Sequence, residues 1–418
     1  MWHLGLGRTR SRALADMSRP RYAFVKREGT HMPDRLSPRA ILDRLVAFPT
    51  VSRDSNLPLI DWVEDYLAGH GITAHRHWNK DGTKAALFAH VGPETEGGVV
   101  LSGHTDVVPV DGQDWTHAPW EVTEADGKLF GRGTTDMKGF DALAIWAAVE
   151  AQHAGVSRPL QLALSYDEEI GCTGAPPLIA AMADLPRASA VIVGEPTGLS
   201  PVTGHKGGVS FEVHVHGYEV HSSILHTGVS AIMWGAKLIE WANELNDRLL
   251  AAEPSALAAP FDPPCTNLHV GRISGGTAHN ITAKDCTFLA GFRVVPGEDP
   301  QDWRRRFHEA AADLTRRMQA IRPEAWIEVR ETFSLPTFVP EEGGEAEALA
   351  RALTGDNGPA GAVSFGTEAS HFQAAGYSAV VCGPGDIAVA HQPDEFITVA
   401  QFEGGQRMMQ RLVEHLAR

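Results

Sequence analysis

Histidines and carboxylates recur along this chain in short segments that also contain glycine or proline. His104 and Asp106 stand two positions apart in GHTDVVP, directly after an apolar run that predicts a buried strand. Mixed imidazole and carboxylate ligation suits Zn²⁺ or Co²⁺, and a two-metal site needs a carboxylate able to bridge. Five segments carry these ligand types: His104 and Asp106 in the first, Asp136 in GRGTTDMKG, Glu168 and Glu169 in YDEEIG, Glu195 in GEPT, and His391 in AHQPDE. Together they predict a site for two metal ions.

Each of these segments also has a simpler interpretation. Asp136 could be the N-cap of the helix that follows it, adjacent glutamates commonly form a solvated loop, and His391 could lie in a turn. If all five segments had such roles, uncompensated charges would crowd one edge of a sheet, which is costly. Metal ligation therefore explains the whole set better than five separate structural roles.

The elements that must position these residues alternate along the chain. Between residues 37 and 199, helical stretches such as MKGFDALAIWAAVEAQ separate the short apolar runs ALFAHV, GVVLSG, LQLALSY and AVIVGEP. This alternation predicts an α/β fold with a mainly parallel sheet covered on both faces, and such sheets carry their sites at the carboxyl ends of the strands. His104, Glu168 and Glu195 all fall at such ends.

The pattern changes after Pro196. VSFEVHVHG alternates with period two, and further strands and two long helical segments follow up to about residue 333. Antiparallel strands with two helices on one face describe a small α+β module. His214 and His216 share one face of its first strand, where we expect surface histidines. We therefore expect one domain over residues 37–199 and 334–418, and a second, inserted domain over residues 200–333.

Composition excludes several classes of protein. The chain has 418 residues and no apolar run of the roughly 18 residues that a membrane helix needs. Its formal net charge of −16 argues against nucleic-acid binding, which depends on clustered Lys and Arg. No GxSxG elbow, HExxH motif or P-loop occurs, and GRGTTD has Asp136 where a dinucleotide fingerprint needs its third glycine. The four cysteines form no CxxC pair and are typical of reduced thiols in a cytosolic protein.

The first residues differ from the rest. Residues 1–31 contain seven Lys or Arg against two acidic residues, without the apolar stretch of a signal peptide. We expect residues 1–36 to be a disordered extension or the product of an upstream start codon, with Met1, Met17 and Met32 as candidate starts; a transit peptide is the alternative. A helix is expected to begin at Ser37 and Pro38, with Ser37 as its N-cap.

In this order, and with a module inserted after GEPT, the metal-ligand segments resemble the M20 family of dinuclear metallo-amidohydrolases and peptidases. The similarity covers about residues 37–418, and HKGGVSFEV, GGTAHNITA, FGTEA and GPGDIAVAHQPDEF resemble in particular the acetylornithine deacetylases of that family. The resemblance implies a metallohydrolase domain with an inserted lid and dimerisation domain, two divalent metal ions (Zn²⁺, with Co²⁺ able to substitute), a cytoplasmic homodimer, and neither nucleic-acid nor membrane partners.

The resemblance also implies roles for the residues around the metals. The metal ligands would be His104 and Glu195 for one ion, Glu169 and His391 for the other, and Asp136 for both. Asp106 would orient His104 through the second ring nitrogen, which fixes the tautomer of the ligand. Glu168 would be the general base that takes a proton from water and delivers it to the leaving amine.

Four further residues would act on the substrate. His221 of the inserted domain would reach the neighbouring subunit's site and stabilise the oxyanion. Asn280 and Arg293 would bind the α-carboxylate of the substrate, for which arginine supplies a bidentate fork. Gly385, in GPG, would expose backbone N–H groups to the ligand.

The expected reaction is hydrolysis of a linear amide, with N²-acetyl-L-ornithine converted to ornithine and acetate in arginine biosynthesis. Within the family, a succinyl-diaminopimelate desuccinylase, an aminoacylase, and a dipeptidase or carboxypeptidase remain alternatives. Outside catalysis, the alternative is a metal-stabilised dimerisation module without activity. Glu168 speaks against that alternative, because a purely structural metal site has no use for a free carboxylate beside the ligands.

Overall fold

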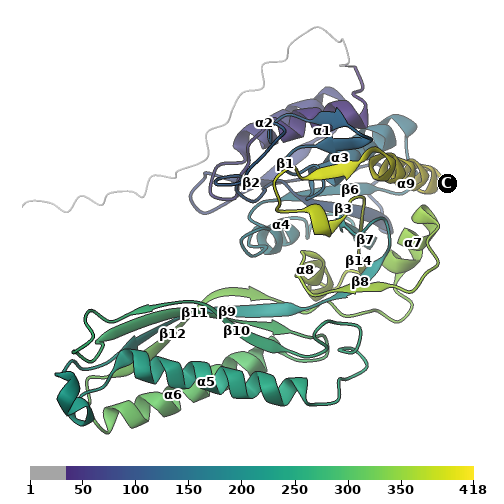
Figure 1. Ribbon diagram of the computed structural model, residues 1–418. Coiled ribbons are helices and arrows are strands. Elements are labelled where there is room, and N and C mark those ends of the chain that lie inside the picture. The colour runs from purple at the N-terminus through teal and green to yellow at the C-terminus, as the bar shows by residue number, and fades with distance from the viewer. Residues whose placement is uncertain (1–33) are drawn as a thin grey trace, which may run out of the picture.

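The computed structural model describes residues 34–418, which form a large layered body and a long, thinner module beside it (Figure 1). The expected extension over residues 1–36, with its three candidate start methionines, lies outside the described residues except for residues 34–36. Helix α1 (Pro38–Val46) begins as predicted, because the Ser37 side chain accepts a hydrogen bond from the backbone N–H of Ala40.

The large body is built on an eight-stranded sheet with the order β1-β2-β6-β3-β7-β14-β8-β13. Strands β6, β3, β7 and β14 run parallel to one another in its centre, whereas β1 and β2 add antiparallel strands at one edge. The strands are β1 (Ala74–Trp78), β2 (Ala85–Val91), β3 (Gly98–His104), β6 (Leu160–Ser165), β7 (Ala188–Pro196), β8 (Val202–His205), β13 (Gly361–Val363) and β14 (Ala379–Gly383).

Helices cover both faces of this sheet, as its continuous apolar strands require. Along β3, Val99 and Leu101 enter one core and Val100 enters the other, because successive side chains point to opposite faces. The first core contains residues of α1, α2 (Leu57–Gly69), α3 (Lys138–Ala154), α7 (Glu345–Thr354) and α9 (Val399–Ala417). The second contains residues of α4 (Ala175–Ala181) and α8 (Ala369–Ala374). A small three-stranded sheet completes the body with β4 (Thr123–Ala125), β5 (Lys128–Phe130) and β15 (Phe396–Thr398).

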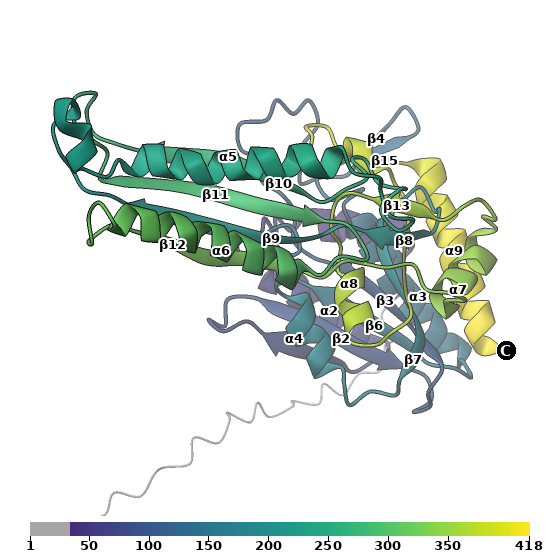
Figure 2. The same cartoon turned by 90° about the horizontal axis from the view of Figure 1, so that it is seen from below.

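The module is a four-stranded antiparallel sheet of β10 (Asn267–Gly275), β11 (Asp285–Val294), β9 (Gly207–His216) and β12 (Trp326–Leu335), in that spatial order. Helices α5 (Ala231–Leu250) and α6 (Pro300–Gln319) cover one face of it (Figure 2). Phe211 and Val213 of β9 are buried under these helices, while Glu212 and His214 point to the open face. The predicted α/β fold with an inserted α+β module is confirmed.

The short helix η1 (Ser222–Thr227) lies at the end of the module that is remote from the large body (Figure 1). A second short helix, η2 (Ile387–Val389), lies in the large body. Among residues 34–418, no helix combines the length and the apolar character that crossing a bilayer requires. The four cysteines are buried and unpaired.

Candidate metal centre

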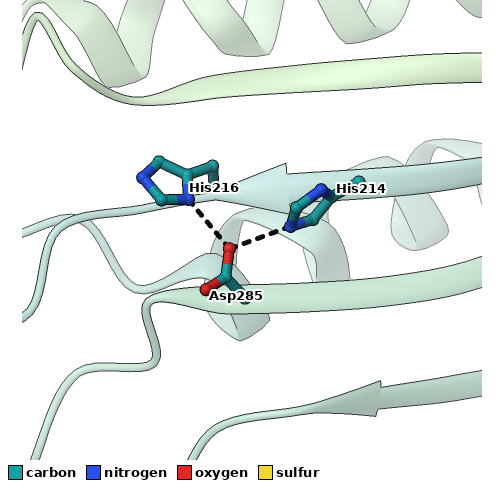
Figure 3. A group of neighbouring side chains, drawn as sticks. All are labelled: His214, His216 and Asp285. Atoms are coloured by element: carbon teal, nitrogen blue, oxygen red, sulfur yellow. Dashed lines mark hydrogen bonds and ion pairs between the residues drawn. The ribbon is translucent and has the colours of Figure 1, made fainter.

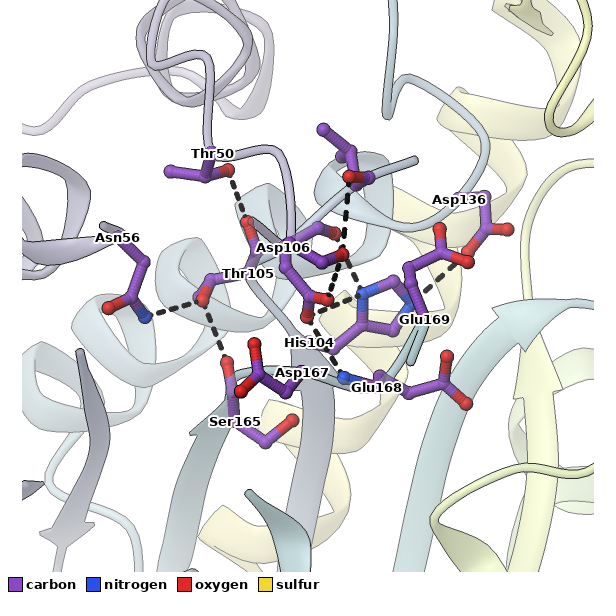
Figure 4. Close-up of polar contacts among 12 residues, drawn as sticks. Thr50, Asn56, His104, Thr105, Asp106, Asp136, Ser165, Asp167, Glu168 and Glu169 are labelled. Atoms are coloured by element: carbon purple, nitrogen blue, oxygen red, sulfur yellow. Dashed lines mark hydrogen bonds and ion pairs between the residues drawn. The ribbon is translucent and has the colours of Figure 1, made fainter. Parts of the chain in front are cut away.

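The predicted metal ligands converge where the central parallel strands end, and Figure 4 shows His104, Asp136 and Glu169 of this set together. His104 is the last residue of β3, and Glu195 is the second-last residue of the neighbouring strand β7. Glu168 and Glu169 follow β6, on the other side of β3. Parallel strands place their carboxyl ends at one edge of a sheet, so these side chains meet although up to 91 positions of sequence separate them.

Asp136 lies between two histidines. Its Oδ1 is 3.1 Å from Nε2 of His104, and its Oδ2 is 3.1 Å from Nε2 of His391. The same nitrogen of His391 is 3.0 Å from Oε2 of Glu169, and Nε2 of His104 is 3.8 Å from Oε1 of Glu195. One carboxylate therefore faces two separate imidazole and carboxylate pairs, the geometry of a bridging ligand.

The residues of this cluster fit two divalent cations. Oε1 of Glu169 and Oε1 of Glu195 are buried and have no hydrogen-bond partner, and a buried carboxylate oxygen without a partner is costly. Ligand atoms of His104, Glu168 and Glu195 lie within 4.8 Å of one another, as do those of His104, Asp136 and Glu169. This mixture of imidazole nitrogen and carboxylate oxygen ligands suits Zn²⁺ or Co²⁺.

The electrostatics of the cluster show an excess of negative charge. Burial, followed by the neighbouring carboxylates, raises the pKa of Glu168 to about 8 and that of Glu169 to about 6. Hydrogen bonds to Asp136 and Glu169 raise the pKa of His391 to about 10. Although burial opposes it, the hydrogen bonds from both histidines lower the pKa of Asp136. Bound cations would remove the penalty that holds these carboxyl groups protonated.

Glu168 and Glu169 have different partners. Glu169 contacts His391, whereas Oε1 of Glu168 accepts a hydrogen bond from Sγ of Cys172 at 3.2 Å. The backbone N–H of Glu168 donates to Oδ1 of Asp106 at 3.1 Å. Both glutamates lie beside the ligand cluster, and Glu168 has no ion pair with His391 among the described residues.

Nδ1 of His104 is held by Asp106, and the nearer acceptor is the backbone carbonyl of that residue, at 2.9 Å. The carboxylate, which was expected to orient the ring, is 3.6 Å away and instead accepts hydrogen bonds from Oγ of Ser52 and the backbone N–H of Glu168. With Nδ1 donating to this carbonyl, Nε2 of His104 is the nitrogen that faces Asp136 and would lose its proton to a bound cation, which gives the tautomer that a metal ligand needs.

Glu395 positions the loop that carries Asp136, a role that sequence reasoning missed. Its Oε1 accepts the backbone N–H groups of Thr135 and Asp136 at 3.0 and 3.1 Å, and its Oε2 accepts from the guanidinium of Arg132 at 2.7 Å. Glu395 and Arg132 are almost fully buried. Asp136 makes no N-cap hydrogen bond to α3, whose N-cap residue is Met137. In the sequence, Glu395 stands out only as a charged residue four positions after His391.

Glu368 lies buried beneath the cluster, and sequence reasoning gave it no role either. Its carboxyl group accepts hydrogen bonds from the hydroxyls of Ser102 and Ser165, at the ends of β3 and β6. Burial raises its pKa to about 7. Glu368 therefore links β3, which ends at His104, to β6, which precedes Glu168.

A cavity of about 370 Å³ connects the cluster to the module, and its lining includes Glu168, Glu169, His391, Ser210, Phe333 and Arg293. Arg293, near the end of β11, is exposed and has no ion pair among the described residues. It is the one predicted substrate-binding residue that the structure places on the wall of this cavity.

The structure places His221 and Asn280 at the remote end of the module. The backbone N–H of Ser222 donates to the carbonyl of Asn280 at 2.9 Å, and both predicted residues are exposed. They follow β9 and β10, and the ten residues of β9 span roughly 33 Å at 3.3 Å per residue. Within one chain, therefore, they are not brought to the metal cluster.

Gly385 lines a different, larger cavity of about 750 Å³. Its φ of 103° favours glycine, and a Cβ atom there would lie 2.3 Å from Oγ1 of Thr135. Its backbone N–H donates to Oε1 of Gln401 at 3.4 Å. Glycine at this position thus lets its loop lie against the residue that precedes Asp136.

The sequence matches the model of peptidase family M20/M25/M40 over residues 100–415. It is 36% identical to an acetylornithine deacetylase of Myxococcus xanthus over 389 residues, which is 90% of this chain and 97% of that protein. The acetylornithine deacetylase of Proteus mirabilis is 34% identical over 89% of this chain and 95% of its own length.

Solved structures share the fold at low sequence identity. Aminopeptidase PepT from Bacillus cereus superimposes with a TM-score of 0.71 at 17% identity, covering 93% of this chain and all of its own. The YXEP protein of Bacillus subtilis, described as a dinuclear metal binding peptidase of the M20 family, gives a TM-score of 0.64 at 15% identity, covering 91% of this chain and 96% of its own.

Proposed function

This chain belongs to peptidase family M20/M25/M40 and is a hydrolase of linear amide bonds, and from that premise we propose that it deacetylates N²-acetyl-L-ornithine to L-ornithine and acetate. The acetylornithine deacetylases of Myxococcus xanthus and Proteus mirabilis, 36% and 34% identical to this chain over almost their whole length, support this choice of substrate. The observation that carries the chemistry is Asp136, whose two oxygens face two separate histidine and carboxylate pairs. The reaction would serve arginine biosynthesis in the cytoplasm.

His104 and Glu195 would bind one metal ion, Glu169 and His391 would bind the other, and Asp136 would bind both. When bound, a pair of Zn²⁺ ions supplies Lewis-acid polarisation of the amide carbonyl and lowers the pKa of water. Co²⁺ has similar ligand preferences and would substitute. The unpartnered buried oxygens of Glu169 and Glu195 support this ligand set.

Glu168 moves the proton in this proposal. It lines the same cavity as Arg293, and its backbone N–H is held by Asp106, which supports a place for its carboxylate beside the reacting water. It would accept a proton from the attacking water and deliver it to the amine nitrogen as the carbon–nitrogen bond breaks. Nearby cations would keep its carboxyl group ionised, although burial alone favours protonation.

Arg293 would bind the α-carboxylate of the substrate. Its guanidinium is free of ion pairs within residues 34–418, it is exposed, and it shares a cavity wall with Glu168. A carboxylate held by a bidentate arginine would leave the acetyl amide of the same molecule pointing towards the metal cluster. Gly385 remains a proposed substrate-binding residue, acting through the loop that lies against Thr135.

The enzyme would work as a homodimer. Residues 37–199 and 334–418 would form the catalytic domain, and residues 200–333 would form the lid and dimerisation domain. Exposed apolar side chains gather near His221 and Asn280 at the remote end of the module: Ile224, Leu225, Ile232, Met233 and Ile281. A second copy that covered this surface would bring His221 to the oxyanion and Asn280 to the substrate of its partner.

The test is amine release by the metal-loaded protein on a panel of N-acetyl-L-ornithine, other N-acetyl amino acids, N-succinyl-diaminopimelate and a dipeptide. The proposal predicts the highest kcat/KM for N-acetyl-L-ornithine. Preference for another amide would overturn the substrate and leave the metal chemistry. No turnover on any of them with both metals bound would favour the non-catalytic alternative.

A further inference from the structure

A second group of histidine and carboxylate side chains lies on the open face of the module sheet, remote from the metal centre. His214 and His216 alternate along β9, and Asp285 begins the neighbouring strand β11 (Figure 3). The helices α5 and α6 cover the opposite face, so this group faces outwards. The side chains of His214, His216 and Asp285 are 34%, 24% and 51% exposed, so solutes can reach all three.

Three ligand atoms of this group converge. Nε2 of His214 and Nδ1 of His216 each lie 2.8 Å from the same oxygen, Oδ1 of Asp285. In a strand, residues two positions apart share one face, and Asp285 is the direct cross-strand partner of His216. The pairing of β9 with β11 thus fixes the group, because it sets which carboxylate stands opposite the two rings.

Neighbouring side chains hold the rings in this arrangement. The ring of Trp326 stacks on His216 with centroids 5.0 Å apart and planes 13° apart, and it meets His214 edge to face at 4.8 Å. Glu328 is the cross-strand partner of His214 on the other side, so its carboxylate shares the same face. The group therefore has an aromatic wall, and a second carboxylate stands on the same face of the sheet.

These distances are close to what a tetrahedral cation requires. Zinc binds imidazole nitrogen and carboxylate oxygen at about 2.0–2.2 Å, so neighbouring ligand atoms of a tetrahedral site lie roughly 3.4 Å apart. The present separations of 2.8 Å need only a small outward movement of exposed side chains. Two histidines and one carboxylate leave a fourth position for water or for Glu328.

We propose that His214, His216 and Asp285 bind a divalent cation of the zinc class, in a site separate from the metal pair of the large body. The site does not depend on the proposed deacetylase activity, because none of its residues lines the cavity that contains Glu168 and Arg293. Its ligands are exposed and only three in number, so it binds zinc more weakly than the buried pair and exchanges it faster.

The experiment counts zinc bound per chain after metal removal and dialysis against a series of buffered free-zinc concentrations. The wild-type protein is compared with H214N/H216N and with Asp285→Asn, which removes one ligand oxygen and keeps both rings. A matched control is H75N/H77N, because His75 and His77 also alternate along one strand, β1, but form no such group with a carboxylate among the described residues.

The wild type and H75N/H77N should each bind one zinc ion more per chain than H214N/H216N, and Asp285→Asn should need a higher free-zinc concentration to fill that extra site. Equal zinc binding by the wild type and H214N/H216N would overturn the proposal. Equal loss in H75N/H77N would overturn it as well, because the loss would then follow from any exposed histidine pair. Circular dichroism of the metal-free variants checks that each is folded.

Discussion

The metal centre and the group of His214, His216 and Asp285 combine the same residue types and differ mainly in burial. In the large body, His104, Asp136 and Glu195 are at least 94% buried, and several carboxyl groups crowd around two imidazoles. On the module, His214 and His216 share a single half-exposed carboxylate. Burial raises the pKa of Glu168 to about 8, whereas at Asp285 the hydrogen bonds from His216 and His214 outweigh burial and lower the pKa.

The difference indicates which group depends on a metal. A buried carboxylate without a counter-charge is protonated or destabilising, so the central cluster is under electrostatic strain until cations arrive. The exposed group is stable without one, since water and hydrogen bonds satisfy it. The same residue types therefore predict a tightly held metal pair in one region and an exchangeable ion in the other.

The largest effect is expected from Glu168→Gln in the buried region. The substitution keeps the shape of the side chain but removes the proton acceptor, so kcat should fall by about 10²–10⁴-fold, with two metal ions still bound. The matched control is Glu212→Gln, a half-buried glutamate on the open face of the module sheet, which should retain full activity. Full activity in Glu168→Gln would contradict the role of that residue.

Asp106→Asn should weaken metal binding at the central site, by a smaller factor than the loss of kcat in Glu168→Gln. The carboxylate of Asp106 accepts from Ser52 and from the backbone of Glu168, and its carbonyl holds His104. Residues that orient a metal ligand typically contribute about 10–100-fold to metal affinity or activity. Metal dissociation constants of this variant and of Asp313→Asn, an exposed helix position, would measure the loss. Equal constants would show that the backbone carbonyl alone orients His104.

The stability of the metal-free protein should fall as pH rises from about 5 to about 8. Glu168, Glu169 and Glu368 have folded-state pKa values of about 8, 6 and 7, above those of the unfolded chain. Between the unfolded and the folded pKa of each group, the folded protein binds more protons than the unfolded chain. Each rise in pH through this range therefore favours unfolding. Urea unfolding in chelator would measure the slope, which saturating zinc should reduce.

Glu368→Gln isolates one part of this pH dependence. The amide mimics the protonated carboxyl group beside Ser102 and Ser165, so the variant should lose less stability between pH 5 and 8 than the wild type. Glu328→Gln, on the exposed module face, should keep the wild-type slope. Identical slopes for the wild type and Glu368→Gln would show that Glu368 does not titrate in this range.

The smallest effect concerns the exposed group. At a free-zinc concentration tenfold above its dissociation constant, a site that exists only in the folded chain adds about 1.4 kcal/mol to the free energy of unfolding. H214N/H216N should lose that increment and keep the larger one from the buried pair. Measuring the free energy of unfolding at two zinc concentrations separates the increment of the exposed site from that of the buried pair. An unchanged increment in H214N/H216N would place the weaker zinc elsewhere.

The sequence predicted the parts of this fold that depend on local pattern. Alternation of apolar residues located β9 and its outward histidines, and the apolar runs located the central strands with His104 at the end of one. It did not predict that Asp285, 69 positions after His216, would stand opposite the two rings, because strand register is set by the whole sheet.

The candidate ligands were predicted from residue types, whereas their pairing and roles came from the resemblance. His391 follows Asp136 by 255 positions, and no local rule joins them. Glu395 and Glu368 were missed because a single glutamate reads as a surface residue, whereas each is buried and hydrogen-bonded beneath the site. The remote position of His221 follows from the length of β9, which sequence reasoning did not convert into a distance.

The most direct test of the central claim is a crystal structure of the zinc-loaded protein with anomalous diffraction at the zinc edge. Two strong peaks should flank Asp136, one bound by His104 and Glu195 and the other by Glu169 and His391, with the carboxylate of Glu168 unligated. A single peak, or Glu168 in place of Glu169 among the ligands, would contradict the two-metal site with Glu168 as its base.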